Sequence, residues 1–286
     1  MIMETNQNIK YTFSGHETFY CKNLWLKKGY DFVKKGNSFT SEDSVVTLGV
    51  GKNMVSSIRY WLRSFGLLCG DSLTDIADYI FDDKKGKDPY VEDLGTLWLL
   101  HFLLVEKKIA TLYNWFFTRF QRERLEFDKQ QVVRFVERCM VEDNKMNLFN
   151  SNTVKKDVGV LLQSYVLPSK SMTFDDYNSL LIDLELIRSE EDKTFRFNLE
   201  GKRELPWYIF LYAILVKKGE NKTVSFDLLQ EIGLIFCMSD IEVIEKCLYI
   251  QGQMPNIVRY SDTAGIKQLQ FLKNLSSEVI LDEYYG

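Results

Sequence analysis

The segment Gly49-Val50-Gly51-Lys52 comes nearest in residue types to a phosphate-binding loop. Such a loop needs a glycine five residues before the glycine of its Gly-Lys pair, and a Ser or Thr after the lysine to hold magnesium. Val46 and Asn53 occupy those two positions here. The sequence therefore disfavours a nucleotide site of this class, and a glycine turn between two helices explains the same residues.

Acid–base chemistry is the next possibility, and two groups of side chains have suitable types. His16 and Glu17 are adjacent, but neighbours on a helix point about 100° apart. We therefore expect a first-turn glutamate and a hydrogen-bonded histidine there. Four later residues loosely resemble the arrangement of a metal-dependent nuclease, namely Asp183, Glu185, Glu191 and Lys193. Charges on a surface hairpin account for these four, so we expect no enzymatic activity and keep a nuclease as a minor alternative.

Metal binding is not favoured, because the five cysteines form no C-x-x-C pair and the chain has two histidines. We expect reduced, mostly buried thiols at Cys21, Cys69, Cys139, Cys237 and Cys247. His101 lies within an apolar run and is expected to be a core histidine. The sequence predicts no metal and no cofactor.

Contact with nucleic acid is the chemistry that the segment 52–65 favours. Its apolar residues recur at helical spacing and would face a core, namely Met54, Val55, Ile58, Trp61, Leu62 and Phe65. The other side carries polar and basic residues, namely Lys52, Asn53, Ser56, Ser57, Arg59 and Arg63. Lys52 and Asn53 at the helix start are placed to contact a DNA phosphate and a base edge, respectively. We expect DNA contacts at Lys52, Asn53, Ser56, Arg59 and Arg63.

The elements that would position this segment form a helix-turn-helix pattern. The sequence predicts a helix over 17–35, a short helix after the capping residues 40–43, a glycine turn, and the helix 52–65. In this arrangement the second helix of the pair lies in the DNA major groove. Residues 66–68 and 72–81 could add a short strand and a packing helix, but no β-hairpin wing is evident.

A second copy of the pattern begins at the capping segment Asn150-Ser151-Asn152-Thr153. It opens a helix over 154–165 that directs Lys155 and Lys156 outward, and we expect these two lysines to be further DNA contacts. A helix over 173–184 and a hairpin over 186–198 follow. This hairpin is a plausible wing.

A weaker third version comprises helices over 224–233 and 239–250 and a hairpin over 256–271. The sequence therefore predicts a mainly α fold, in which winged-helix or helix-turn-helix-like modules with short β-hairpins surround a central helical body. Three helices rich in Leu, Trp and Phe, over 92–105, 110–120 and 127–141, are expected to form its core.

The charged run 82–89 ends in a proline and predicts a linker. It places the first domain boundary near residue 86. The predicted domains are a helix-turn-helix module over 1–86, a central helical body with the second winged-helix-like unit over 87–205, and a C-terminal module over 206–286.

The distribution of charge supports an anionic partner for the first module. The net charge of the 286 residues is −4, but residues 1–68 carry nine Lys/Arg and five Asp/Glu, so the remainder is acidic. The apolar runs are too short to cross a bilayer, and the N-terminus is too polar for a signal peptide. We therefore expect a cytoplasmic protein with no membrane partner.

Several of these segments together resemble the bacterial family called domain of unknown function 4007. The resemblance rests on Phe13–Phe19, Leu24–Gly29, Leu48–Val55 with Ser57–Trp61, Asp88–Asp93 with Thr96–His101, and Val154–Val158. Many members have an arginine shortly after the Gly-His-Glu-Thr-Phe block, where this chain has Cys21-Lys22-Asn23. A phosphate contact made by that arginine would pass to Lys22 or be absent.

The resemblance implies a setting of phage defence and DNA phosphorothioation, in which family members occur beside phosphosulfate-reductase-like enzymes. It assigns no biochemical activity. We expect a non-enzymatic component that binds duplex DNA. The alternative is a protein–protein adaptor for a reductase-like or ATPase subunit of the same defence system.

Overall fold

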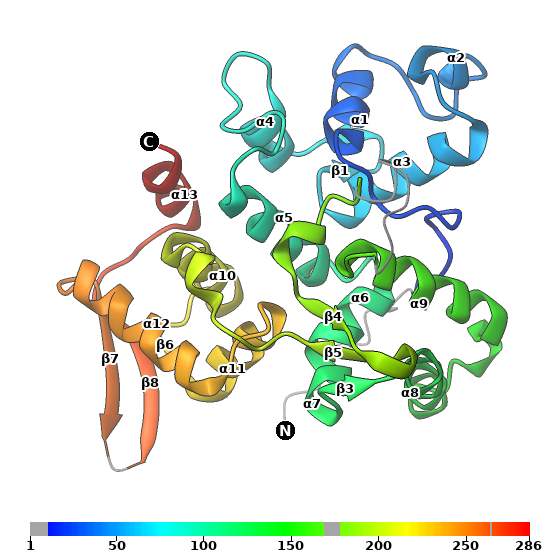
Figure 1. Cartoon of the computed structure of the whole chain (residues 1–286). Coiled ribbons are helices and arrows are strands. Elements are labelled where there is room, and N and C mark those ends of the chain that lie inside the picture. The colour runs from blue at the N-terminus through cyan, green and yellow to red at the C-terminus, as the bar shows by residue number, and fades with distance from the viewer. Residues whose placement is uncertain (1–10, 169–177, 264) are drawn as a thin grey trace.

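The computed structural model describes residues 11–168, 178–263 and 265–286. As the sequence predicts, this part of the chain is mainly α-helical and contains short antiparallel sheets. Helix α5 (Leu94–Glu106) lies centrally between three groups of elements (Figure 1). Among the described residues, no helix is long and apolar enough to cross a membrane.

The first group contains α1 (Trp25–Lys34), α2 (Ser44–Leu48), α3 (Lys52–Ser64), β1 (Leu68–Cys69), β2 (Ser72–Leu73) and α4 (Asp75–Phe81). The pair α2 and α3 matches the sequence prediction. Gly49, with φ of 63°, ends α2 in the left-handed conformation that glycine adopts without strain. Gly51, in an extended conformation, is the N-cap residue of α3.

Two predictions for this group were wrong. The first helix begins at Trp25 rather than at residue 17, because Glu17, Thr18 and Leu24 have φ of 49°, 68° and 65°, which a right-handed helix does not contain. A small hairpin also exists where none was expected. Strands β1 and β2 pair around a turn at Gly70 and Asp71.

The second group follows α5. It contains α6 (Thr111–Trp115), a π-helical segment (Phe116–Phe120), α7 (Gln121–Glu123), β3 (Glu126–Phe127), α8 (Lys129–Glu142), α9 (Ser151–Tyr165), β4 (Ile187–Ser189) and β5 (Phe195–Phe197), with 3-10 turns at Met146–Leu148, Ile182–Leu184 and Glu191–Lys193. The hairpin β4–β5 was predicted, whereas β3 was not. The sheet order is β3-β5-β4, so the early strand pairs with the last one.

A helix was predicted over 173–184, but the described residues of this range do not form one. Residues 173–177 lie outside the described residues, and 178–184 contain only a 3-10 turn at Ile182–Leu184. The backbone of 178–180 pairs instead with 21–23, with Leu180 N–H donating to the Cys21 carbonyl at 2.9 Å. This extended pairing is incompatible with a helix at the same residues.

The third group repeats the order of the second. It contains a 3-10 turn (Lys202–Glu204), α10 (Trp207–Lys218), β6 (Thr223–Ser225), α11 (Phe226–Ile235), α12 (Asp240–Gln253), β7 (Val258–Thr263), β8 (Ile266–Phe271) and α13 (Ser277–Tyr285). Its sheet order is β6-β8-β7. In both groups a helix, a short strand, two helices and a hairpin follow one another, and the first strand pairs with the last.

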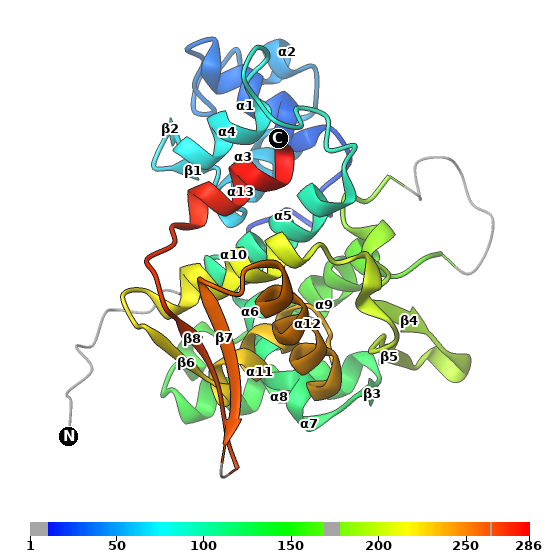
Figure 2. The same cartoon turned by 90° about the vertical axis from the view of Figure 1, so that its left-hand side faces the viewer.

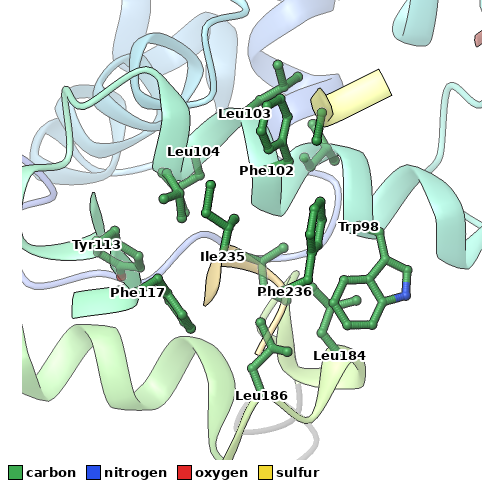
Figure 3. Packing of buried hydrophobic residues seen from close by; sticks show 14 of the residues in the cluster. Trp98, Phe102, Leu103, Leu104, Tyr113, Phe117, Leu184, Leu186, Ile235 and Phe236 are labelled. Carbon is green, nitrogen blue, oxygen red and sulfur yellow. The ribbon is translucent and has the colours of Figure 1, made fainter. Parts of the chain in front are cut away.

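One buried apolar cluster extends through all three groups. Its centre is α5, where every residue from Gly95 to Val105 is buried. Phe236, at the end of α11, packs on α5 with ring centroids 6.0 Å from Trp98 and 6.1 Å from Phe102 (Figure 3). The aromatic residues that the sequence assigned to the core are buried, namely Trp98, Trp115, Phe116, Phe117 and Phe120.

The C-terminal helix α13 joins the third group to the first (Figure 2). The Tyr284 hydroxyl donates to Asp93 Oδ1 at 2.6 Å, and the Tyr285 hydroxyl lies 2.8 Å from Thr96 Oγ1. Tyr79 of α4 donates to Asp282 at 2.9 Å. These three contacts hold the C-terminal helix against the start of α5 and against α4.

Candidate nucleic-acid interface

Helix α3 exposes most of the residues that the sequence assigned to DNA contact. Lys52, Asn53, Ser56 and Arg63 are exposed, and Arg59 is partly buried. The helix contains three basic residues and no acidic one. Ser57, which was expected on the same side, is fully buried. Among the described residues, Lys52 and Arg63 make no ion pair, and they lie at the two ends of the helix.

The buried face of α3 fixes the direction of the exposed one. Trp61 is 1% exposed, and its indole N–H donates to the Phe19 carbonyl at 3.1 Å. The Trp61 ring stacks on His16 and meets Tyr113 of α6 edge-on at 5.7 Å. Gly15 lies beneath the Tyr60 ring so closely that a Cβ there would collide with it. The segment before α1 therefore clamps α3 against α6.

His16 belongs to this clamp rather than to an acid–base pair. The Thr18 N–H donates to His16 Nδ1 at 3.2 Å, so a neutral imidazole carries its proton on Nε2, which lies 3.2 Å from Asp157 Oδ1. The same carboxylate accepts the Ser14 N–H at 2.8 Å. The predicted hydrogen bonding of His16 is confirmed, whereas the first-turn role of Glu17 was wrong because no helix begins there.

Arg59 is engaged by an acidic partner within the same group. Its Nη2 lies 2.6 Å from Asp71 Oδ1 on the β1–β2 turn. Its Nε is buried and has no hydrogen-bond partner among the described residues. Arg59 is thus held in position at one edge of α3, and the guanidinium retains unused donor capacity.

A surface pocket of about 540 Å³ opens beside α3. It is lined by Thr12, Gly15, Phe39, Ser56, Arg59, Tyr60, Arg63, Lys107, Lys108 and Ile109. Four of these residues are basic, and none of the lining residues is acidic. Lys107 and Lys108 follow α5 and were not among the predicted site residues. Only their isolated position between two apolar helices marks them in the sequence.

The second predicted contact, on α9, lies elsewhere. Lys155 and Lys156 are exposed, as expected, and make no ion pair with any described residue. They do not line the pocket beside α3. The two lysines of α9 are therefore not part of that pocket, whose lining holds four cations.

The loosely nuclease-like residues are only partly brought together. Glu185 and Glu191 line one pocket of about 560 Å³ beside β4, whereas Asp183 and Lys193 do not line it. Within the part of the chain that the structure describes, no group of three or more His, Cys, Asp or Glu side chains could hold a metal ion. The five cysteines are unpaired thiols, and Cys69 is the exposed one.

His101 is a core residue, as predicted. It is fully buried, and its Nε2 donates to the Ile235 carbonyl at 2.6 Å, since a carbonyl can only accept. Nδ1 therefore accepts from the Tyr165 hydroxyl at 2.8 Å. Burial lowers the pKa of His101 to about 4, so the ring is neutral at pH 7.

Comparisons with known proteins found one family and two solved structures. A family model described as "Protein of unknown function (DUF4007)" matches residues 13–285. Two solved structures have the same fold over 96% of this chain and 88% of theirs, at 24% sequence identity. They are "Magnesium ion-bound SspB crystal structure", with a TM-score of 0.81, and "SspB crystal structure", with a TM-score of 0.82. No curated protein matches the chain.

Proposed function

This chain belongs to the DUF4007 family, and from that premise we propose that it is a non-enzymatic DNA-binding component of a bacterial defence or DNA phosphorothioation system. The observation that supports DNA binding most directly is helix α3. It follows α2 after a short glycine turn and contains no carboxylate. One of its sides exposes Lys52, Asn53, Ser56 and Arg63. Cations supply affinity for phosphates, and polar side chains can contact base edges.

The order of elements supports winged-helix modules. In a winged helix, two packed helices are followed by a hairpin, and an earlier strand completes the sheet. The sheet orders β3-β5-β4 and β6-β8-β7 have this form, and α2–α3 with β1–β2 is a shortened version that lacks the early strand. By this correspondence α3, α9 and α12 occupy the position of the recognition helix.

The three corresponding helices differ in charge, and this difference suggests which of them contacts DNA. Helix α3 has three basic residues and no acidic one, and α9 has two lysines and one buried aspartate. Helix α12 contains Asp240, Glu242 and Glu245 but only Lys246 as a cation. Since like charges repel the phosphate backbone, we assign DNA contact to α3 first, to α9 second, and not to α12.

The test measures binding of the full chain to duplex DNA by fluorescence anisotropy at several salt concentrations. Substituting Arg59→Ala together with Arg63→Ala should weaken binding and reduce the salt slope by about two units, since each phosphate contact contributes about one. The matched control is Arg259→Ala with Lys273→Ala, which removes two exposed cations from the third group. The control should leave the slope within about half a unit of the wild-type value.

Equal effects of the two pairs would show that α3 is not the contact surface. If the α3 pair has no effect and Lys155→Ala with Lys156→Ala lowers the affinity, α9 is the helix that contacts DNA. No duplex binding at low salt would overturn the proposal itself.

The non-enzymatic part of the proposal needs its own test, because one of the two similar solved structures is described as magnesium ion-bound. The described residues of this chain do not offer a cluster of His, Cys, Asp or Glu for such an ion, and no step here depends on one. Supercoiled plasmid incubated with the protein and Mg²⁺ should remain intact. Nicked or linear product that disappears on addition of a chelator would overturn the assignment as a non-enzyme.

One observation favours the adaptor alternative for the third group. Helix α12 exposes Ile241, Leu248 and Tyr249, of which Ile241 is 70% exposed and Leu248 lies two turns further along the same side. Exposed apolar side chains on one helix face are typical of protein contacts. A partner subunit that co-purifies with the wild type and is lost on Ile241→Glu would support this role, alongside DNA binding or in its place.

A further inference from the structure

We propose that the pocket beside α3 binds the phosphate and the adjoining nucleoside of a single nucleotide. This inference deepens the proposed function and rests on it in one respect: the pocket shares Ser56, Arg59 and Arg63 with the DNA-contacting face of α3. It adds Lys107 and Lys108, which no sequence pattern assigned to a site. The pocket would hold one nucleotide while the rest of α3 contacts the backbone.

Charge is the first argument. Two arginines of α3, four residues apart on one helix side, face the same pocket as two adjacent lysines that follow α5. Asp71 offsets the charge of Arg59, but Arg63, Lys107 and Lys108 lie at one pocket without an acidic partner among the described residues. These three cations repel one another, and an anion between them relieves that repulsion.

The second argument is positioning. Lys107 is not a freely moving surface lysine, because its aliphatic stem lies across Gly66, where a Cβ would collide with the stem. Lys108 has φ of 58°, a conformation that is unfavourable for a lysine and that redirects the chain after α5. Arg59 has a buried Nε with no hydrogen-bond partner among the described residues. The ion pair with Asp71 at 2.6 Å holds the Arg59 guanidinium in place at the pocket.

The third argument is size and the nature of the remaining wall. A volume of about 540 Å³ lies within the ~300–1,000 Å³ range of pockets that bind small molecules. It exceeds the space that one phosphate group needs. Phe39, Tyr60 and Ile109 also line the pocket and provide apolar surface suited to a base or a sugar. Thr12 and Ser56 add polar groups to the lining.

The test uses the full chain and thymidine monophosphate as the probe, measured by isothermal titration calorimetry. Thymidine monophosphate should bind, and both thymidine and inorganic phosphate should bind at least tenfold more weakly, because each lacks one half of the ligand. Lys107→Gln with Lys108→Gln should weaken binding of the nucleotide at least tenfold. The matched control is Lys84→Gln with Lys85→Gln, another adjacent pair of exposed lysines whose side chains make no described contact. This control should leave the affinity unchanged.

A second arm distinguishes a free nucleotide from a nucleotide within a strand. It compares single-stranded oligonucleotides with a 5′-phosphate or a 5′-hydroxyl. Binding of the phosphorylated strand alone, with the same dependence on Lys107 and Lys108, identifies a strand end as the ligand and supports the proposal. Binding of thymidine monophosphate identifies a free nucleotide and also supports it.

Two results would overturn the proposal. One is that neither probe binds, or that the two glutamine pairs behave alike. The other is that inorganic phosphate binds as tightly as the nucleotide, which would make the pocket a simple anion site. The duplex measurement on the same proteins separates this outcome from the proposed function. If the α3 substitutions abolish duplex binding but no nucleotide binds, the proposed function stands and the nucleotide pocket is overturned. If the nucleotide binds but no duplex does, the nucleotide pocket stands and the proposed function is overturned.

Discussion

Among single residues, His101 has the clearest consequence for stability. Because its ring is buried and neutral, the free energy of unfolding should depend on pH. Both ring nitrogens are used, one as a donor to Ile235 and one as an acceptor from Tyr165. Protonation would place a second donor opposite a hydroxyl within an apolar core. The folded state therefore holds the pKa of His101 at about 4, below the value of about 6.5 in an unfolded chain.

Because the folded pKa is the lower one, the unfolded chain binds the proton more readily between the two values. The stabilisation is present above about pH 6.5 and is lost as the pH falls towards 4. Between pH 7 and pH 5 this residue should remove about 2 kcal/mol from the free energy of unfolding. Urea denaturation at the two pH values measures this loss. His101→Gln should reduce the difference by that amount, and an unchanged difference would show that folding does not lower the pKa of His101.

At the same scale, the sequence predicted the exposed residues of α3 but not their neighbours. Lys52, Asn53, Ser56 and Arg63 could be found because helical spacing separates a polar side from an apolar one. Asp157 and Lys107 could not, since their roles depend on residues far away in the sequence. Asp157 contacts Ser14, and Lys107 lies on Gly66. No local pattern records such contacts.

At the scale of elements, the docking of α13 on α5 can be tested through Gly95. The Asp93 side chain caps α5 by accepting from the Gly95 and Thr96 N–H groups, and the Tyr284 hydroxyl donates to the same carboxylate. A Cβ on Gly95 would collide with the Tyr284 ring and hydroxyl. The absence of a side chain at Gly95 therefore allows α13 to pack closely against the start of α5.

Replacing a helical glycine by alanine normally stabilises a protein by about 0.5–1 kcal/mol. Gly159→Ala, in the middle of α9 with open space around its Cβ position, should show this gain. Gly95→Ala should instead lower the free energy of unfolding by about 1–3 kcal/mol, since overpacking forces α13 away. The two can be compared by thermal and urea denaturation.

A double-mutant cycle identifies the cause of the loss at Gly95. In the Tyr284→Ala background, Gly95→Ala should cost little or should stabilise, because the colliding ring is absent. An undiminished cost in that background would contradict the docking of α13.

Helices with clear capping residues could be predicted from the sequence, and the shortest strands could not. The capping segment that begins at Asn150 marked α9, and the Asn150 side chain accepts the Thr153 N–H. Strands β3 and β6 have two and three residues, too few for an alternating pattern, and they form because a distant hairpin offers them a partner. The helix expected from residue 17 failed because Phe19 resembles the apolar stripe of α1 while its neighbours have positive φ.

At the scale of the whole molecule, the three groups share a core across the expected domain boundaries near residues 86 and 205. Trp61 meets Tyr113 at 5.7 Å, and Phe102 stacks on Phe236 at 6.1 Å. Tyr79 also contacts Tyr285 at 6.0 Å. We therefore expect the three groups to unfold together.

Urea unfolding should show one transition, with coincident curves from far-UV circular dichroism and tryptophan fluorescence. The tryptophans report on different groups, since Trp61 lies in the first group, Trp98 in α5 and Trp207 in α10. Two separated transitions would instead support independent domains. A fragment ending near Gly86 loses the side chain that covers Trp61, so it should unfold at lower urea than the full chain.

The contact between Tyr284 and Asp93 also determines when the fold can be completed during synthesis. The two residues are 191 positions apart, and α13 is translated long after α5. At about 5–20 residues per second, the ribosome takes roughly 10–40 seconds to cover that distance. During this interval the nascent α5 waits with its first turn uncovered, and chaperones that bind apolar segments have access to it. A slowly translated or prematurely terminated chain should therefore depend on such chaperones far more than the finished protein does.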